Sequence, residues 1–311
     1  MLQDPIGITA IPSCFSSGAG DDQYAAVTKS GQTLFMSVYK TQIAGTSRCI
    51  TITWFKHLLL HGLSVSVDGV ESTQTEPTCK VELKPWCFWR KQGSKRFTIA
   101  GKTLDVFWDL KAAKFNGETE PSSEYYVAVV CDQEVVLLLG DLKKDAYRKT
   151  GCRPALFDPV LLSRKEHVFG KKKFSTRLKF HEKGQFHNLS IECKNKSSGK
   201  DGGFPAMEIR IDEHLMINVR HLQWKFRGNE CIQFSKVRIE VYWDIHDWLF
   251  SPGLRHALFI FKVAVPVSSP AISTPCSSLS LDTDSGSGGV DGFDSSGLNE
   301  FFLFLYAWKV E

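Results

Sequence analysis

The sequence predicts an all-β protein built from two similar halves. The pentapeptide VFWDL at residues 106–110 recurs in similar form as VYWDI at residues 241–245. Short segments of alternating apolar and polar residues, separated by turn-forming residues, fill most of the chain. With 42% apolar and 12% aromatic residues, the 311-residue chain has enough material for a sizeable core.

The two halves align under one constant shift of the chain, which places Leu104 on Ile239. The same shift places all of Leu104–Leu110 on Ile239–Ile245, and every position in this run is identical or similar. One face of each segment is apolar and the other is acidic and aromatic, as expected for a half-buried antiparallel strand. We therefore predict an internal repeat. Its structural anchors are the four pairs Trp89 and Trp224, Gly93 and Gly228, Trp108 and Trp243, and Asp109 and Asp244.

The other predicted strands follow in the same order in both halves. In the first half they are residues 34–40, 49–54, 63–68, 104–110, 124–130 and 134–139, and in the second half 174–180, 188–193, 207–212, 239–245, 256–262 and 301–306. We expect about eight strands in each half, joined by short turns as an antiparallel meander. A meander of this length either closes into a barrel or forms two packed sheets, and the sequence leaves both solutions open.

One short helix is predicted between the halves. The segment DLKKDAYRKT covers residues 141–150, with Asp141 as its N-cap and Gly151 as its stop.

The composition also predicts the domain boundaries. We expect a disordered tail at 1–24, a first β repeat at 25–155 and a second at 156–311. Residues 264–298 are rich in Ser, Gly, Pro and Asp, and such a segment buries too little apolar surface to offset the entropy of ordering. We predict that this segment is a disordered insertion in the second repeat.

The sequence carries no sign of a membrane or secretory protein. No apolar run approaches the roughly 18–20 residues that a transmembrane helix needs, and the start of the chain does not resemble a signal peptide. The nine cysteines are odd in number and form no CxxC motif, which favours a reducing compartment. We expect a cytoplasmic protein.

Positive charge is concentrated between residues 141 and 180. This segment has twelve Lys or Arg and four Asp or Glu, a net charge of 12 − 4 = +8 in a chain of net charge +4. Such a cluster fits anionic lipid headgroups, nucleic-acid phosphates or the chain's own acidic loop near Asp282 and Asp284, and it also fits a solvated connector. The residues that we assign to a site for an anionic partner are Lys143, Lys144, Arg148, Lys149, Arg164, Lys165, Lys171, Lys172 and Lys173.

Three further motifs suggest chemistry but have simpler explanations. In DIHDW (244–248), His246 lies between two carboxylates, but the first half has no counterpart of it. In HLLLH (57–61), the two histidines have metal-ligand spacing only on a helix, and the flanking segments are predicted strands. In FWRKQGSKRF (88–97), aromatic and basic residues interleave as in binders of single-stranded nucleic acid, but core packing and a turn explain the repeated Trp and Gly. We expect no catalytic residues, no cofactor and no metal.

Several long phrases resemble one known family. They are KVELKPWCFWRKQGSKRF (80–97), EVVLLLGDLKKDAYRKT (134–150), SRKEHVFGKKKFSTRLKF (163–180), HLQWKFRGNE (221–230), VYWDIHDWLFSPGLRHALFIF (241–261) and LFLYAWKVE (303–311). The chain from about residue 32 onward is similar to a plant-specific family of uncharacterised proteins, domain of unknown function 868. The resemblance implies a plant protein and supplies no established activity or catalytic residue.

Three functions are therefore kept as hypotheses. The first is a non-catalytic binding or scaffold protein that acts through its surface on proteins or anionic lipid surfaces. The second is a lipocalin-like carrier or an isomerase-type enzyme for an apolar metabolite, in which Trp108 and Trp243 would line a ligand site. The third is a peripheral binder of anionic membranes or nucleic acid through the basic connector. The sequence leans against an enzyme.

Overall fold

The computed structural model shows a protein that is nearly all β, as predicted. It describes residues 33–57, 60–68, 78–83, 91–99, 101–180, 184–194, 205–235, 237–253, 255–266 and 298–310. Within these residues there are two short helices, α2 (Lys143–Thr150) and α3 (His246–Phe250). The chain divides into two compact units, the first Met1–Val160 with Lys165–His167 and the second Leu161–Arg164 with Val168–Glu311.

The first unit contains two groups of hydrogen-bonded strands. In the first group the strands lie in the order β1 (Thr33–Ile43), β2 (Thr46–His57), β3 (Leu60–Val67) and β4 (Thr78–Leu83). In the second group the order is β5 (Gln92–Ile99), β6 (Lys102–Asp109), β7 (Tyr126–Cys131), β8 (Glu134–Gly140) and β9 (Arg153–Pro154). All neighbours are antiparallel except β8 and β9, which are parallel.

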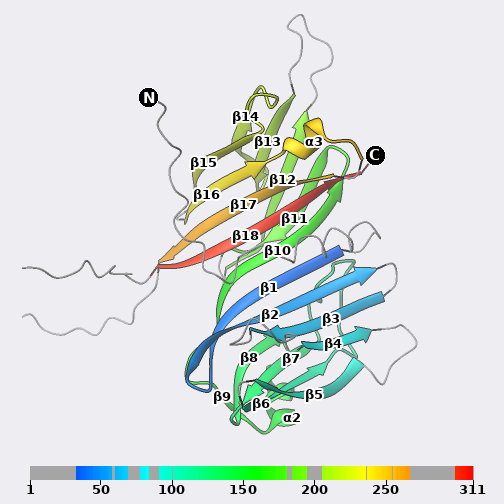
Figure 1. Cartoon of the computed structure of the whole chain (residues 1–311), viewed down its shortest axis with the longest axis vertical. Coiled ribbons are helices and arrows are strands. Elements are labelled where there is room, and N and C mark those ends of the chain that lie inside the picture. Colours follow the sequence, from blue (N-terminus) through cyan, green and yellow to red (C-terminus); the bar gives the residue numbers. More distant parts are fainter. Residues whose placement is uncertain are drawn as a thin grey trace, which may run out of the picture. The chain divides into compact units, whose positions relative to one another are not determined.

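The second unit also has two groups. One is a four-stranded sheet in the order β11 (Lys173–Leu178), β12 (His187–Lys194), β13 (Ala206–Ile211) and β14 (His214–Val219). In the other, β15 (Arg227–Phe234), β16 (Val237–Asp244), β17 (Arg255–Pro266) and β18 (Leu298–Lys309) lie side by side, followed by β10 (Val160–Gly170) (Figure 1).

The described strands form no closed barrel, so the barrel interpretation is wrong. In the first unit the second sheet stops at β9, which adds only two residues to β8. In the second unit the four-stranded sheet keeps two edges, β11 and β14. No described strand pairs with the outer side of either edge strand. Edge strands are commonly protected from pairing with other chains by charged side chains. Strand β11 is of this kind, since Lys173 and Arg177 are exposed on it.

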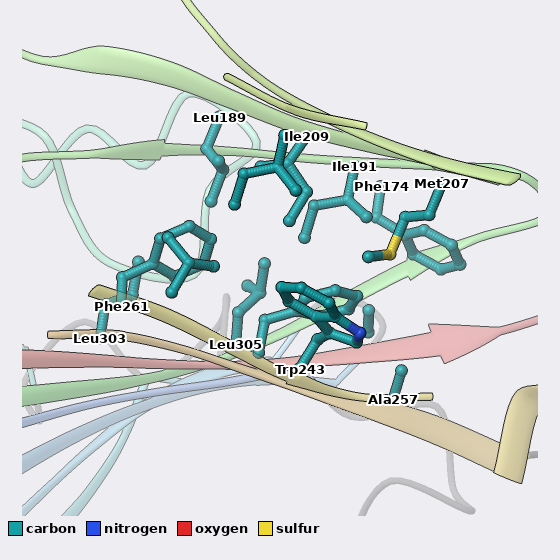
Figure 2. Close-up of a cluster of buried hydrophobic side chains, with 14 of the residues drawn as sticks. Phe174, Leu189, Ile191, Met207, Ile209, Trp243, Ala257, Phe261, Leu303 and Leu305 are labelled. Atoms are coloured by element: carbon teal, nitrogen blue, oxygen red, sulfur yellow. The ribbon is translucent and has the colours of Figure 1, made fainter. Parts of the chain in front are cut away.

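The core of the second unit lies between its two sheets. Figure 2 shows Phe174, Leu189 and Ile209 of the four-stranded sheet pointing toward Trp243, Phe261 and Leu303 of the other sheet. The strands alternate accordingly, with Ile239, Val241 and Trp243 buried along β16. This is the period-two pattern that the sequence predicted for this segment.

A glycine faces the predicted tryptophan in both units. Gly93 of β5 pairs with Trp108 of β6, and Gly228 of β15 pairs with Trp243 of β16. A Cβ atom at Gly93 would lie 2.8 Å from Cζ2 of Trp108, and one at Gly228 would lie 2.4 Å from Cζ2 of Trp243. Both glycines are therefore in strands, where they leave room for an indole ring, and our assignment of these glycines to a turn is wrong.

Strand ends also match between the units. In the first unit Leu110 N donates to Lys91 O, and in the second Ile245 N donates to Phe226 O. Asp109 Oδ1 accepts a hydrogen bond from Lys111 N, and Asp244 Oδ1 accepts one from His246 N, each 3.1 Å long. Both aspartates thus fix the turn that follows their strand.

Helix α2 covers one face of the second sheet of the first unit. All six residues of β7 are buried, whereas β17 alternates between buried and half-buried residues. Ala146 of α2 is fully buried against Tyr126, Ala128 and Val130, which explains the continuous burial. Gly151 ends the helix with a φ of 66°, as predicted. The N-cap prediction is wrong, because Leu142 holds that position and Asp141 Oδ1 accepts from Tyr125 N at 3.1 Å.

Parts of the predicted boundaries lie outside the described residues. These are the tail at 1–24, most of the insertion at 264–298, and Trp89. Strand β17 runs to Pro266 and β18 begins at Leu298, so both ends of the predicted insertion belong to strands.

Candidate functional site

A groove of about 560 Å³ opens on the first unit. Its walls are the turn between β1 and β2, the turn between β7 and β8, and the chain from β9 to Phe157. The first of these segments lies far from the other two in the sequence, so their meeting is a result of the fold. The lining residues include Ala44, Lys102, Asp132, Arg153, Leu156 and Phe157.

Two tight turns form the walls of this groove. Ala44 and Gly45 have φ angles of 52° and 78°, and Asp132 and Gln133 have φ angles of 49° and 63°. Each pair is the two-residue loop of a β-hairpin, and two positive φ angles in succession are typical of the type I′ turn. Beneath the turns, buried Thr41 Oγ1 donates a 3.0 Å hydrogen bond to Val136 O, which joins β1 to β8.

The third wall exposes two large apolar side chains. Arg153 N donates to Gln133 O at 3.1 Å and Ala155 N donates to Val135 O at 3.3 Å, so the backbone is held to β8 up to Ala155. Directly after this anchor, Leu156 is 82% exposed and Phe157 is 65% exposed. Two adjacent exposed apolar residues beside a groove are typical of an interaction site, in contrast to apolar residues scattered singly over a surface.

Two ion pairs flank the apolar residues. Lys102 Nζ lies 3.1 Å from Asp132 Oδ2, and Arg153 Nη2 lies 2.6 Å from Glu134 Oε1. Both cations are at least half exposed, so these pairs contribute little to stability and can exchange partners with a ligand. The Cys131 thiol is buried in the same wall, and burial, together with the charge of Asp132, raises its pKa. It is therefore a protonated, weakly nucleophilic thiol.

The structure divides the predicted basic site between the two units. Lys143, Lys144, Arg148 and Lys149 belong to α2 of the first unit, where Arg148 pairs with Asp145. Arg164 and Lys165 are half-buried on β10. Lys171, Lys172 and Lys173 are exposed where the chain enters β11 of the second unit.

Sequence reasoning missed three residues beside the lysine run. Arg177 and Lys179 lie four and six residues after Lys173. Residues separated by an even number of positions along a strand have side chains on the same face. The ring of Phe186 lies under both, 4.7 Å from Arg177 Cζ and 4.4 Å from Lys179 Nζ. The period-two spacing of these cations was the signal in the sequence, but the position of Phe186 depends on the pairing of β11 with β12.

The two histidine motifs have structural roles in the described residues. His246 begins α3, where its Nδ1 lies 3.1 Å from Asp247 Oδ1 and its ring contacts Phe226 and Phe250. His61 lies on β3, with its ring 4.0 Å from that of Phe115. Burial, with the charge of Lys56, lowers the pKa of His61. Within the described part of the chain, no cluster of three or more His, Cys, Asp or Glu side chains could hold a metal ion.

The position of Trp224 contradicts the prediction that this residue packs in the core. It lies in the turn before β15 and is 80% exposed. The turn itself is well held, because Leu222 is buried and Trp243 Nε1 donates to Lys225 O at 3.1 Å. Of the two aligned tryptophans in this unit, Trp224 and Trp243, only Trp243 packs in the core, and it is 7% exposed.

The fold and its surfaces define an all-β protein of two units with a groove on one of them. The chain belongs to a family described as plant protein of unknown function (DUF868), whose model matches residues 30–309. No curated protein and no solved structure matches the chain. Among the described residues, no helix is both long and apolar enough to span a membrane.

Proposed function

We propose that this protein is a non-catalytic binding or scaffold protein, and that the groove of the first unit binds a short segment of a partner protein. The observation that carries the proposal is the exposure of Leu156 and Phe157 on a backbone that is hydrogen-bonded to β8. Covering each of these side chains would contribute about 1.5–3 kcal/mol of binding free energy. A fixed backbone also lowers the entropic cost of binding.

The charges around the groove indicate what kind of segment fits. Lys102, Asp132, Glu134 and Arg153 offer both signs at its edge. Rim charges of this kind select a partner and its register more than they add affinity. A partner segment with one or two apolar side chains between charged residues would match this arrangement.

The chemistry of the groove supports binding in preference to catalysis. Its cysteine has a raised pKa, which is the opposite of the shift that activates a thiol nucleophile. Its four charged side chains are engaged in pairs at the surface, where solvent screens them.

Co-purification from plant tissue tests the proposal. The double variant Leu156→Ser, Phe157→Ser should lose at least one protein that co-purifies with the unmodified chain, as measured by quantitative mass spectrometry. The matched control is Leu215→Ser, Trp224→Ser, which removes two exposed apolar residues from the second unit. Identical sets of co-purified proteins for both variants would refute a role for the groove.

The carrier hypothesis receives less support. It requires Trp108 and Trp243 in the wall of an enclosed ligand cavity. Their rings lie instead against Gly93 and Gly228, and the described strands form no closed barrel. The hypothesis of an anionic partner is favoured by one observation, the unbroken row of cations that enters β11.

We also propose that the two units are copies of one ancestral unit. The shift that places Leu104 on Ile239 also relates Gly93 and Trp108 to Gly228 and Trp243, and each glycine pairs with its own tryptophan. The same shift relates the hydrogen bond from Leu110 to Lys91 with that from Ile245 to Phe226. Agreement in hydrogen-bond register supports common origin more strongly than agreement in residue type.

A cytoplasmic location is part of the same proposal. Five of the cysteines, Cys49, Cys131, Cys152, Cys193 and Cys231, are free thiols. Proteins of reducing compartments keep their thiols in this state.

A further inference from the structure

A basic stripe runs along an edge strand of the second unit. We use this name for Lys171, Lys172, Lys173, Arg177 and Lys179. Lys173 and Arg177 are exposed on β11, the edge strand of the four-stranded sheet, and half-buried Lys179 follows two residues beyond Arg177, just past the end of the strand. Successive side chains on one face of a strand are about 6.6 Å apart. Lys173, Arg177 and Lys179 therefore share one face of the sheet, and Lys171 and Lys172 directly precede the strand.

The acidic residues of this sheet leave most of the stripe uncompensated. Glu208 binds Lys194 at 2.7 Å and Arg210 at 2.8 Å, and Asp212 binds His187 at 2.6 Å. Glu192, which pairs with Lys173 in register, is the one acid on β12 opposite the stripe. Five cations and this carboxylate give 5 − 1 = +4, and in the described part of the chain none of the five cations forms an ion pair.

An aromatic ring lies at the end of the stripe formed by Arg177 and Lys179. Phe186 is 52% exposed, while Arg177 and Lys179 lie over its ring. The next residue, His187, is fixed by its bond to Asp212 and by contacts with Phe180 and Phe234. This anchor fixes the backbone next to Phe186, and with two cations over its ring the residue keeps about half of its surface exposed.

We propose that the basic stripe and Phe186 form a binding site for single-stranded nucleic acid. Single strands bind where cations follow the phosphate backbone and an exposed ring stacks on a base. A line of cations suits a linear polyanion. A membrane surface is better matched by a broad basic patch with apolar side chains that project into the bilayer, whereas the stripe has a single exposed ring, with two cations over it. This site is separate from the groove and goes beyond the function proposed for it.

Binding to a fluorescent single-stranded RNA of about 16 nucleotides, followed by anisotropy over a range of salt concentrations, tests the proposal. Five phosphate contacts at about 0.7 each predict a slope of about −3.5 for log K against log salt concentration. The triple variant Lys172→Gln, Arg177→Gln, Lys179→Gln should reduce that slope by about 2. The matched control Lys40→Gln, Lys111→Gln, Lys225→Gln removes the same charge from exposed positions outside the stripe and should leave the slope unchanged.

Phe186→Leu separates stacking from general attraction of charge. Loss of one stacked base predicts binding that is weaker by about 5- to 150-fold with an unchanged salt slope. Circular dichroism confirms that the variant is folded, which we expect because the ring is half exposed. Three results would overturn the proposal: no RNA binding by the unmodified chain, equal losses in the two triple variants, or Phe186→Leu binding as the unmodified chain does. Tighter binding to phosphatidylserine vesicles than to RNA would also overturn it and would assign the stripe to a membrane instead.

Discussion

Gly228 is the residue on which the packing of Trp243 depends most directly. The indole lies over the backbone of the edge strand at the position where any other residue would place a Cβ atom. Trp243 Nε1 then reaches Lys225 O at 3.1 Å. Because Gly228 has no side chain, the indole of Trp243, the largest residue of β16, can cover the edge of the core.

Replacing this glycine should therefore destabilise the second unit. In Gly228→Ala the new methyl group would meet Cζ2 of Trp243 at 2.4 Å, and overpacking of this kind costs about 1–3 kcal/mol. Denaturant unfolding measures the change. The neighbouring exposed residue provides a control, since Asn229→Ala should change the free energy of unfolding by less than about 0.5 kcal/mol. Equal stability of the two variants would show that the indole does not need the glycine.

Asp212 provides a pH-dependent contribution to stability. Its Oδ2 lies 2.6 Å from His187 Nδ1, and its Oδ1 accepts from Asn188 N at 2.8 Å. The bond to His187, with the backbone bond from Asn188, lowers the pKa of Asp212. A carboxyl group whose pKa is lowered on folding stabilises the fold above its unfolded pKa, and this stability is lost as the pH falls through the folded pKa.

Asp212→Asn should consequently lower stability by about 1 kcal/mol at neutral pH. The difference from the unmodified chain should shrink as the pH is lowered below about 4, where the carboxylate becomes protonated. Thermal unfolding at several pH values measures this difference in stability. Asp158→Asn, at an exposed position, is the control and should change little at any pH. A difference that grows in acid would contradict the assigned role.

Single residues show where sequence reasoning reaches its limit. The aligned positions of Trp108 and Trp243 were sufficient to predict two buried indoles. Trp224 has the same residue type and aligns with Trp89 under the same shift, but it is exposed. Burial depends on whether a second sheet covers the position, and residue type alone does not contain that information.

At the scale of elements, the strands were predictable because their burial alternates. Strand β16 has the period-two pattern expected when one face meets the core. Strand β7 lacks it, because α2 packs on its other face and makes all six residues buried. The sequence predicted both the strand and the helix here. It could not predict which sheet the helix would cover.

Helix α3 is held by one of its two aromatic residues. Trp248 is 8% exposed, stacks on Phe174 at 4.6 Å and donates from Nε1 to Ala307 O at 2.8 Å. Phe250, two residues further on, is 51% exposed. The five-residue helix is too short to be stable alone, so its position depends on this tryptophan.

Trp248→Ala should lower the free energy of unfolding by about 3–5 kcal/mol, because it leaves a large cavity and an unpaired carbonyl group. Phe250→Ala in the same helix should cost less than about 1 kcal/mol. Urea unfolding of both variants measures the two losses in free energy of unfolding. Similar losses in both would mean that α3 is held by its exposed side as much as by its buried side.

The whole molecule consists of two β units with matching strand register around their aligned tryptophans and with different surfaces. The constant shift between the halves could be found in the sequence because hydrogen-bonded neighbours such as Gly93 and Trp108 are close along the chain. The groove could not be found there. Its walls come from residues 42–45, 131–136 and 153–157, and only the fold brings them together.

The two units also differ in what they expose. The first presents Leu156 and Phe157 beside paired charges, and the second presents a row of cations with one phenyl ring. The two proposed sites, the groove for a protein segment and the basic stripe for single-stranded nucleic acid, therefore belong to different units.

Site-specific photocrosslinking tests the central claim, binding at the groove, most directly. A photoreactive phenylalanine analogue at Phe157 should give crosslinked protein adducts in plant extract. The same analogue at Phe250, also exposed but on the second unit, should not give those adducts. Adducts specific to Phe157 are the predicted result. The same adducts at both positions, or none at Phe157, would contradict the claim.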